Sequence, residues 1–411
     1  MINYQDFTLD NGLKVIVHED RSTPLCVLNI LYNVGSRDES EDKTGFAHLF
    51  EHLMFGGSKN VPSYDEPLQK VGGENNAFTS PDITNYYLTL PANNIETGFW
   101  LESDRMMSLS FDPQVLEVQR KVVIEEFKQR YLNQPYGDLW LKLRPLAYKV
   151  HPYKWATIGK EISHIENATM DDVKEFFFKF YRPNNAVLVL AGNISVEKAK
   201  ELSEKWFGPI ESGVVSKRNL PVEPAQKEKR ILEIKDKVPM NTLTKTFHMC
   251  SRNDPDYFAT DLLSDLLGRG KSSRMYRELV KGSQLFNSIS CYVTGSYDPG
   301  LLVVTGRLNE GVSFEKAEQE VDRILKDIKN GLDETELQKV KNQAESTVVF
   351  GEMELLNRAM KLAFYEIQGH LTEVNNEVKS IMDVDSKQIT SIANKILTDQ
   401  NSSVVYYHSQ N

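Results

Sequence analysis

The sequence predicts an α+β fold built from two copies of one unit, and three observations favour it. At 411 residues, the chain is too long for one ordinary hydrophobic core. Segments typical of strands and helices follow in a similar order in both halves. The segment HLFEHLMFGG from His48 to Gly57 aligns with DLLSDLLGRG from Asp261 to Gly270, and the segment from Met170 to Asn193 resembles that from Asp385 to Ser409. We therefore expect two homologous domains.

The first half opens with a hairpin signal, because Asp10-Asn11-Gly12 separates two short apolar segments. Alternation from Leu28 to Val34 then indicates a half-buried strand. Asp112-Pro113 is typical of a helix start, with aspartate as the N-cap and proline in the first turn. The remaining expected elements are a helix at 45–55, a strand at 83–90, the helix after Asp112 up to about residue 131, and a strand at 186–191.

A segment rich in proline and charge, without periodicity, separates the halves between Gly208 and Lys229. We place a zinc-bearing domain at 1–212, a linker at 213–229 and the homologous second domain at 230–411. The second half repeats the order with strands near Ile231 and at 242–249, a helix from about Pro255, and strands at 287–292 and 301–305.

Composition excludes several classes of protein. Asp and Glu number 58 against 48 Lys and Arg, a net charge of −10, which argues against nucleic acid and anionic membranes as partners. No segment has the roughly 20 apolar residues of a membrane span. The N-terminal sequence lacks the features of a signal peptide, so we expect a cytoplasmic protein, or a periplasmic one if a leader has been trimmed.

The strongest chemical signal is the pattern H-x-x-E-H at His48, Glu51 and His52. Histidines four residues apart share one helix face, where two neutral imidazoles can bind one zinc ion. Glu51 can then act as a base toward a metal-bound water without being a ligand. The alternative is a pair of surface histidines, but the chain has only 8 histidines in all.

The third ligand is expected from the helix that follows Asp112. Glu126 lies within the apolar arc of that helix, whereas Glu125 points roughly 200° away from Val123 at about 100° per residue. A carboxylate on a buried face must be paired or metal-bound, which favours Glu126. The alternative is an ion pair between Glu126 and a buried arginine.

The segment from Gly73 to Leu90 is a candidate substrate edge. We expect a turn that begins with glycine, followed by a strand that carries Asn76, Phe78 and Thr79. An exposed edge of this kind can bind a peptide as an added strand through main-chain hydrogen bonds. The alternative is an ordinary sheet edge.

Taken together, these motifs resemble the pitrilysin and mitochondrial-processing-peptidase family of inverzincins, in its short bacterial form. The resemblance covers the whole chain, and the duplicated second half adds to it. It rests on four segments: FAHLFEHLMFGGS at 46–58, GGENNAFTSPDITNYY at 72–87, QRKVVIEEF at 119–127 and YRPNNAVLVLAGN at 181–193.

The resemblance implies a zinc metallopeptidase that cleaves peptides or unfolded segments. One zinc ion per chain would be bound by His48, His52 and Glu126, with Glu51 as the general base. Asn76, Ala77 and Phe78 would lie on the strand that pairs with the substrate. The fold would be two homologous α+β domains, each a mixed sheet with helices packed on it, and two chains would close around a chamber.

Two positions depart from the family pattern. Gln119 stands where the family often has glutamate, at a supporting position. In the second half, Val280 and Asn287 stand where the family often has an Arg and a Tyr that stabilise the reacting carbonyl; nearby Arg274, Tyr276 and Arg277 have a different spacing.

We therefore expect a heterodimer whose homologous partner chain supplies the Arg and the Tyr, with a homodimer as the other possibility. Two other functions stay open, a non-catalytic assembly subunit and a small-molecule metallohydrolase.

Overall fold

The computed structural model describes residues 1–214 and 218–410. Residues 215–217, inside the predicted linker 213–229, lie outside the described part. The chain divides into two compact units. Unit 1 comprises Met1–Leu132, Trp155–Pro221 and Phe350–Asn375, and unit 2 comprises Asn133–Lys154, Val222–Val349 and Asn376–Asn411. In the described part of the chain, no helix is both long and apolar enough to cross a membrane.

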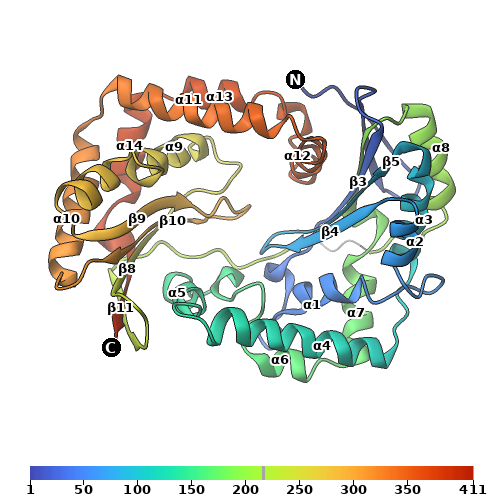
Figure 1. Ribbon diagram of the computed structural model, residues 1–411, viewed down its shortest axis with the longest axis horizontal. Helices are drawn as coiled ribbons and strands as arrows, with labels where there is room; N and C mark the ends of the chain where they lie inside the picture. Colours follow the sequence, from blue (N-terminus) through green and yellow to red (C-terminus); the bar gives the residue numbers. More distant parts are fainter. Residues whose placement is uncertain (215–217, 411) are drawn as a thin grey trace. The chain divides into compact units, whose positions relative to one another are not determined.

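Unit 1 contains a six-stranded mixed sheet with the order β1-β2-β6-β3-β5-β4. Figure 1 labels its strands β3, β4 and β5. Strands β2 and β6 pair in parallel, and the other neighbours are antiparallel. The predicted hairpin is confirmed, with Gly12 in the left-handed region at φ 84° between β1 and β2. The strands are β1 Gln5–Thr8, β2 Lys14–Glu19, β3 Leu25–Tyr32, β4 Glu74–Thr79, β5 Thr84–Pro91 and β6 Ala186–Gly192.

Helices cover both faces of this sheet. Helix α12 comes from the second half of the chain, yet it belongs to unit 1 and packs on β3 and β6. The helices of unit 1 are α1 Phe46–Leu53, α2 Asp65–Lys70, α3 Ile95–Met107, α4 Pro113–Phe127, α6 Ile162–Glu166, α7 Met170–Phe180, α8 Val196–Trp206 and α12 Leu355–Ile367.

The burial of β3 beneath helix α12 differs from the prediction. The alternation in β3 predicted a half-buried strand, but every β3 residue after Leu25 is buried. Asn29, on the side expected to be polar and exposed, is fully buried. Its side-chain amide instead exchanges two hydrogen bonds with that of Asn85, at 3.0 and 2.8 Å, which satisfies both buried groups.

Unit 2 repeats the topology with a five-stranded mixed sheet in the order β7-β11-β8-β10-β9. Strands β7 and β11 pair in parallel, as β2 and β6 do, and β9 occupies the edge position that β4 has in unit 1. The prediction of two homologous α+β domains with mixed sheets is thereby confirmed. The strands are β7 Arg230–Asp236, β8 Thr242–His248, β9 Phe286–Val293, β10 Leu301–Leu308 and β11 Ser402–Ser409.

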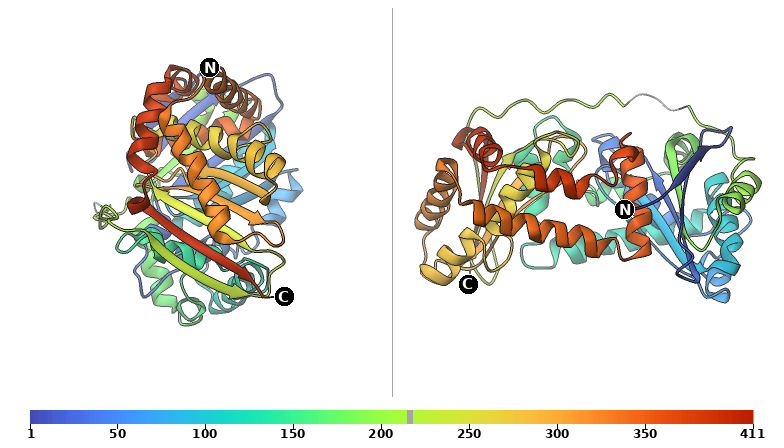
Figure 2. Two further views of the ribbon diagram at one scale, coloured as in Figure 1. Left: turned by 90° about the vertical axis from the view of Figure 1, so that its left-hand side faces the viewer. Right: turned by 90° about the horizontal axis from the view of Figure 1, so that it is seen from above.

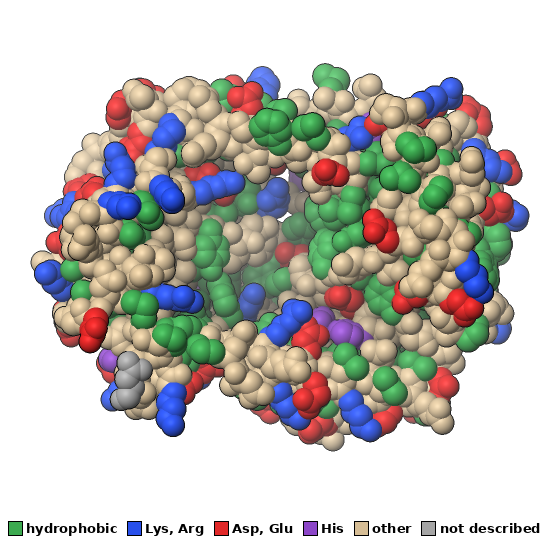
Figure 3. All heavy atoms as spheres, in the orientation of Figure 1, with side chains coloured by type: hydrophobic (Ala, Val, Ile, Leu, Met, Phe, Trp, Pro, Cys, Tyr) green, Lys and Arg blue, Asp and Glu red, His purple; other side chains and the backbone are tan. Residues whose placement is uncertain are grey.

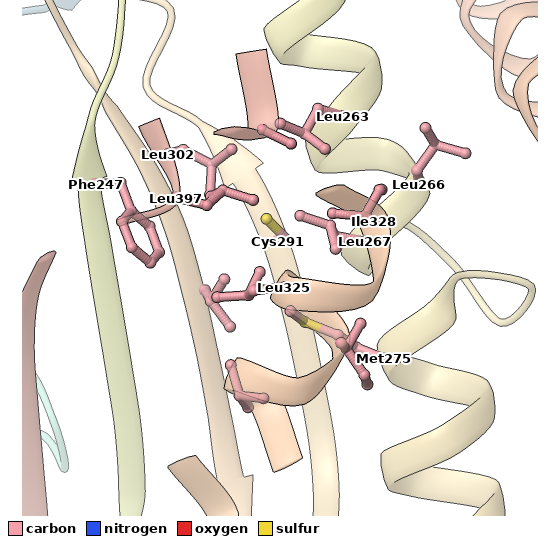
Figure 4. Close-up of a cluster of buried hydrophobic side chains, with 14 of the residues drawn as sticks. Phe247, Leu263, Leu266, Leu267, Met275, Cys291, Leu302, Leu325, Ile328 and Leu397 are labelled. Carbon is pink, nitrogen blue, oxygen red and sulfur yellow. The ribbon is translucent and has the colours of Figure 1, made fainter. Parts of the chain in front are cut away.

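The main core of unit 2 lies between its sheet and helices α9, α10 and α14 (Figures 1 and 2). Leu263, Leu266 and Leu267 of α9 meet Cys291 of β9 and Leu302 of β10 in this layer (Figure 4). Helix α5 contributes to smaller clusters with β7, β10 and β11. The helices are α5 Leu139–Ala147, α9 Tyr257–Gly268, α10 Phe314–Asp327, α11 Glu334–Gly351, α13 Glu377–Asp383 and α14 Ser386–Ile396.

The compact units are not contiguous in sequence. The sequence predicts contiguous domains at 1–212 and 230–411, one for each repeat. In the structure, Asn133–Lys154 of the first repeat packs in unit 2, and Phe350–Asn375 of the second repeat packs in unit 1. Such an exchange leaves no periodic signal in the sequence, because each exchanged segment keeps the pattern of an ordinary amphipathic helix.

Candidate metal centre

Helix α1 positions the H-x-x-E-H motif. Its buried stripe includes Phe46, Leu49 and Phe50, which leaves the motif residues on the opposite, less buried side. The helix begins after Gly45, whose φ of 87° suits glycine and which has no side chain to cap the helix. Glu39 caps the helix instead. Its carboxylate accepts hydrogen bonds from the amides of Gly45 at 2.9 Å and Ala47 at 2.8 Å.

Helix α4 carries Glu126, the residue predicted as the third ligand. Asp112 caps it as expected, accepting a hydrogen bond from the amide of Gln114 at 2.7 Å. The side chain of Glu126 is 18% exposed and that of Glu125 is 59% exposed. The predicted phase of this helix is therefore confirmed.

The structure brings His48, His52 and Glu126 together. The Oε2 atom of Glu126 lies 3.6 Å from Nε2 of His48 and 3.4 Å from Nε2 of His52. These three residues form a group of potential metal ligands whose atoms all lie within 4.8 Å of one another. Histidine side chains reach the surface beside acidic and basic groups on the face shown in Figure 3.

The alternative role for Glu126 was an ion pair with a buried arginine, and the structure shows an ion pair with an exposed one. Arg130 contacts Oε1 of Glu126 at 3.1 Å, but its side chain is 71% exposed. The other carboxylate oxygen, Oε2, faces the two imidazoles. An exposed arginine on one oxygen leaves the second oxygen available to a cation.

The electrostatics of the group suit a metal ion. Burial, together with the neighbouring His52, lowers the pKa of His48 to about 4, so its imidazole is neutral near pH 7 and can offer a lone pair. The imidazole of His52, which faces Oε2, is the main cause that lowers the pKa of Glu126 and keeps that carboxylate charged. The arrangement is one negative carboxylate facing an uncharged, partly buried imidazole.

The residues present also fit zinc by distance. Two ligands about 2.0–2.1 Å from one tetrahedral zinc ion lie about 3.3 Å apart. The measured separations of 3.4 and 3.6 Å are close to that value and longer than a usual N–H···O hydrogen bond. Two imidazoles and a carboxylate are a donor set that zinc accepts.

Glu51 lies beside this group, and its carboxylate belongs to a different hydrogen bond. The hydroxyl of Thr79, at the end of β4, donates to Oε2 of Glu51 at 2.5 Å. Burial raises the pKa of Glu51, and the bond from Thr79 is the largest opposing effect. A carboxylate with a raised pKa beside a metal site is suited to accept a proton.

The predicted substrate residues lie on β4, an edge strand of the sheet of unit 1. Asn76 is exposed, while Ala77 and Phe78 are half-buried. The ring of Phe78 meets that of Phe364 of α12, with centroids 6.3 Å apart. The edge position supports the expected strand addition but does not test it.

Two residues with roles near the motif were missed in the sequence. Glu39 precedes the helix by several residues, and the signal that could have found it is the uncapped Gly45. Thr79 was placed on the strand without a role, because its contact with Glu51 is formed only by tertiary packing.

Val280 and Asn287 stand at the second-half positions where the family often has an Arg and a Tyr. Val280 packs against the core of unit 2, and Asn287 is exposed on β9. Arg274 makes three contacts of 2.8–3.1 Å with the carboxylate of Glu336, so its guanidinium is already bound. Arg277 is 58% exposed and lies 3.8 Å from the same carboxylate.

Comparison with known proteins agrees with this geometry. The family described as Insulinase (Peptidase family M16) matches residues 14–148, and the Peptidase M16 inactive domain matches residues 167–344. The zinc protease PqqE of Helicobacter pylori is 30% identical over 98% of this chain and 92% of its own length. This chain belongs to peptidase family M16.

Further relatives of this M16 chain extend the likeness. The crystal structure of a protease from Helicobacter pylori superposes with a TM-score of 0.93 and 28% identity, covering 99% of this chain and all of the other. A probable mitochondrial-processing peptidase subunit beta of Arabidopsis thaliana is 25% identical over 72% of this chain and 58% of its own length. The four motif residues lie in the segment matched by the Insulinase model, outside the segment matched by the inactive domain.

Proposed function

We propose that this M16 chain is a zinc-dependent metallopeptidase subunit that hydrolyses peptides or unfolded polypeptide segments. The observation that carries the proposal is the convergence of His48, His52 and Glu126 next to Glu51. Family membership supports a peptide substrate over a small molecule, and the open edge of β4 offers a surface on which an extended peptide can pair.

Each residue then has a defined task. His48, His52 and Glu126 would hold the zinc ion, which when bound polarises a water molecule and lowers its pKa. Glu51 accepts a proton from water at its carboxylate while the water oxygen bonds to the carbonyl carbon. The same carboxylate returns the proton to the nitrogen of the leaving amine as the C–N bond breaks.

The first experiment separates the base from the metal. Glu51→Gln keeps the shape of the side chain but cannot take a proton, so it should retain zinc and lose hydrolysis by about 10²-fold or more. Metal analysis and a peptide-cleavage assay on the same sample check this. Near-normal cleavage by a variant with full zinc content would remove Glu51 from its role.

The second experiment uses two neighbouring glutamates as test and control. Glu126→Gln should lose zinc, whereas Glu125→Gln should keep it, because only Glu126 faces the imidazoles. Zinc retained by the Glu126 variant and lost by the Glu125 variant would contradict the assignment.

Partner dependence belongs to the same proposal. Donors placed for the developing oxyanion are worth about 10²–10³ in rate. At the positions aligned with the family's Arg and Tyr, this chain has a packed Val280 and Asn287, and Arg274 nearby is bound to Glu336. We therefore infer a heterodimer in which a homologous chain supplies the Arg and the Tyr.

The inference is tested by assaying the zinc-loaded chain alone and then, if a homologue is encoded nearby, mixed with that homologue. Activity should rise on mixing. Full activity of the isolated chain, unchanged by the homologue, would exclude this arrangement. A non-catalytic assembly subunit is the alternative function, and a purified chain that binds no zinc would favour it.

A further inference from the structure

The carboxylate of the proposed base is anchored from the sheet rather than from its own helix. Thr79 is the last residue of β4, and its Oγ1 donates to Oε2 of Glu51 at 2.5 Å. The contact joins helix α1 to the edge strand of unit 1. Neither histidine of the motif takes part in this hydrogen bond. The position of the Glu51 carboxylate therefore depends on Thr79 and not on the proposed metal ligands.

The backbone around Thr79 is held firmly. In the turn that follows, the amide of Ser80 donates to the carbonyl of Ile83 at 2.9 Å, and the hydroxyl of Ser80 accepts from the amides of Asp82 and Ile83. Asp82 in turn forms a buried ion pair with Arg37 at 3.0 Å. A donor at the end of such a strand has little freedom to move away from its acceptor.

Fixing one carboxylate oxygen has a chemical consequence. A glutamate side chain has several rotatable bonds, and an unfixed carboxylate would sample positions from which it cannot reach the reacting water. A hydrogen bond to Oε2 orients the group and leaves Oε1 as the free acceptor. Bonds to charged groups are strong enough to hold a single orientation.

We propose that Thr79 is a positioning residue whose hydroxyl fixes the Glu51 carboxylate for proton transfer. It thereby ties the base to the strand that carries Asn76, Ala77 and Phe78, the residues expected to pair with substrate. This inference rests on the proposed peptidase function, and it adds a residue that the H-x-x-E-H motif does not contain.

Three variants test the inference with zinc content measured in each. Thr79→Val keeps the shape and removes the hydroxyl, and kcat should fall about 10- to 100-fold with KM and zinc unchanged. Thr79→Ser restores the hydroxyl and should recover most of kcat. Thr89→Val is the matched control, because strand alternation places Thr89 on the opposite face of the sheet, and it should leave kcat unchanged.

Several results would overturn the inference. Wild-type kcat in Thr79→Val would show that the hydroxyl is not needed, and equal losses in Thr79→Val and Thr79→Ser would show that the hydroxyl is not what matters. Loss of zinc from Thr79→Val would assign Thr79 to the metal site instead of the base.

Crystal structures of the wild type and Thr79→Val give a result that does not depend on turnover. The Glu51 carboxylate should be ordered in the first and displaced or multiply placed in the second. An unmoved carboxylate would refute the Thr79 role even in a chain without peptidase activity, whereas absent activity with the expected displacement would refute only the proposed function.

Discussion

Helices α1 and α9 occupy equivalent places in the two units, yet only α1 has the residues of a metal site. His48 and His52 of α1 align with Asp261 and Asp265 of α9. Where the imidazoles of α1 face the carboxylate of Glu126, Asp265 pairs with Arg269 of its own chain at 3.0 Å. In α1 the predicted ligands face one another, whereas in α9 the carboxylate of Asp265 is already paired with an arginine. The difference therefore depends on a few side chains and not on the fold.

The largest effect is expected from giving α1 a residue of α9. His52→Asp replaces an imidazole by a shorter carboxylate that cannot reach the position of Nε2. Zinc content should fall to background, and peptide hydrolysis should fall by at least about 10²-fold. This loss is larger than that expected from removing a residue that only hydrogen-bonds to a ligand. Metal analysis and an activity assay measure both. Full zinc binding by this variant would break the comparison.

Removing the remote cap of α1 should have the next largest effect. Helix α1 has 8 residues and α9 has 12, and short helices depend strongly on their ends. Glu39→Gln leaves one acceptor for two amides, so unit 1 should lose about 2 kcal/mol of stability. Glu41→Gln is the control, because that side chain is 54% exposed and surface pairs contribute little. Urea unfolding of both variants compares them, and equal stabilities would refute the cap.

Glu51 of α1 aligns with Ser264 of α9. The pH dependence of hydrolysis tests the role of the carboxylate that only α1 has at this position. Burial raises the pKa of Glu51 above its ordinary value of 4.5, and the base must be deprotonated to act. Activity of the zinc-loaded chain should therefore fall about tenfold per pH unit below the pKa of Glu51. Zinc content measured at each pH separates this loss from metal release. A rate that stays constant as pH falls, with zinc retained, would contradict it.

The smallest effect concerns Asp265 in α9. Burial raises its pKa from 3.8 to about 6, so the folded state holds the proton more tightly than the unfolded state. The associated stability is complete below about pH 4 and is lost as pH rises through about 6. Asp265→Asn should therefore be about 1 kcal/mol more stable than the wild type at pH 7.5, with a smaller gain at pH 5. Thermal unfolding at both pH values tests this, and a gain independent of pH would contradict it.

Local sequence signals predicted most elements correctly, and the three residues predicted as ligands lie together in the structure. The spacing of His48 and His52 and the phase of α4 were sufficient to select Glu126 over Glu125, because both depend on helix geometry alone. What the sequence could not provide depends on contacts between distant segments. The bond from Thr79 to Glu51 joins two elements, and the burial of Asn29 depends on a helix more than 300 residues away.

That helix, α12, has a consequence for how the chain can be divided. A fragment ending at the linker would retain β3 and β6 but lack the α12 surface that covers them. It would also lack Arg358, which binds His18 and Asp20 near the end of β2. Separate expression of the two repeats should therefore yield fragments that expose apolar sheet surface and aggregate. Each repeat therefore depends on a segment of the other to cover its sheet.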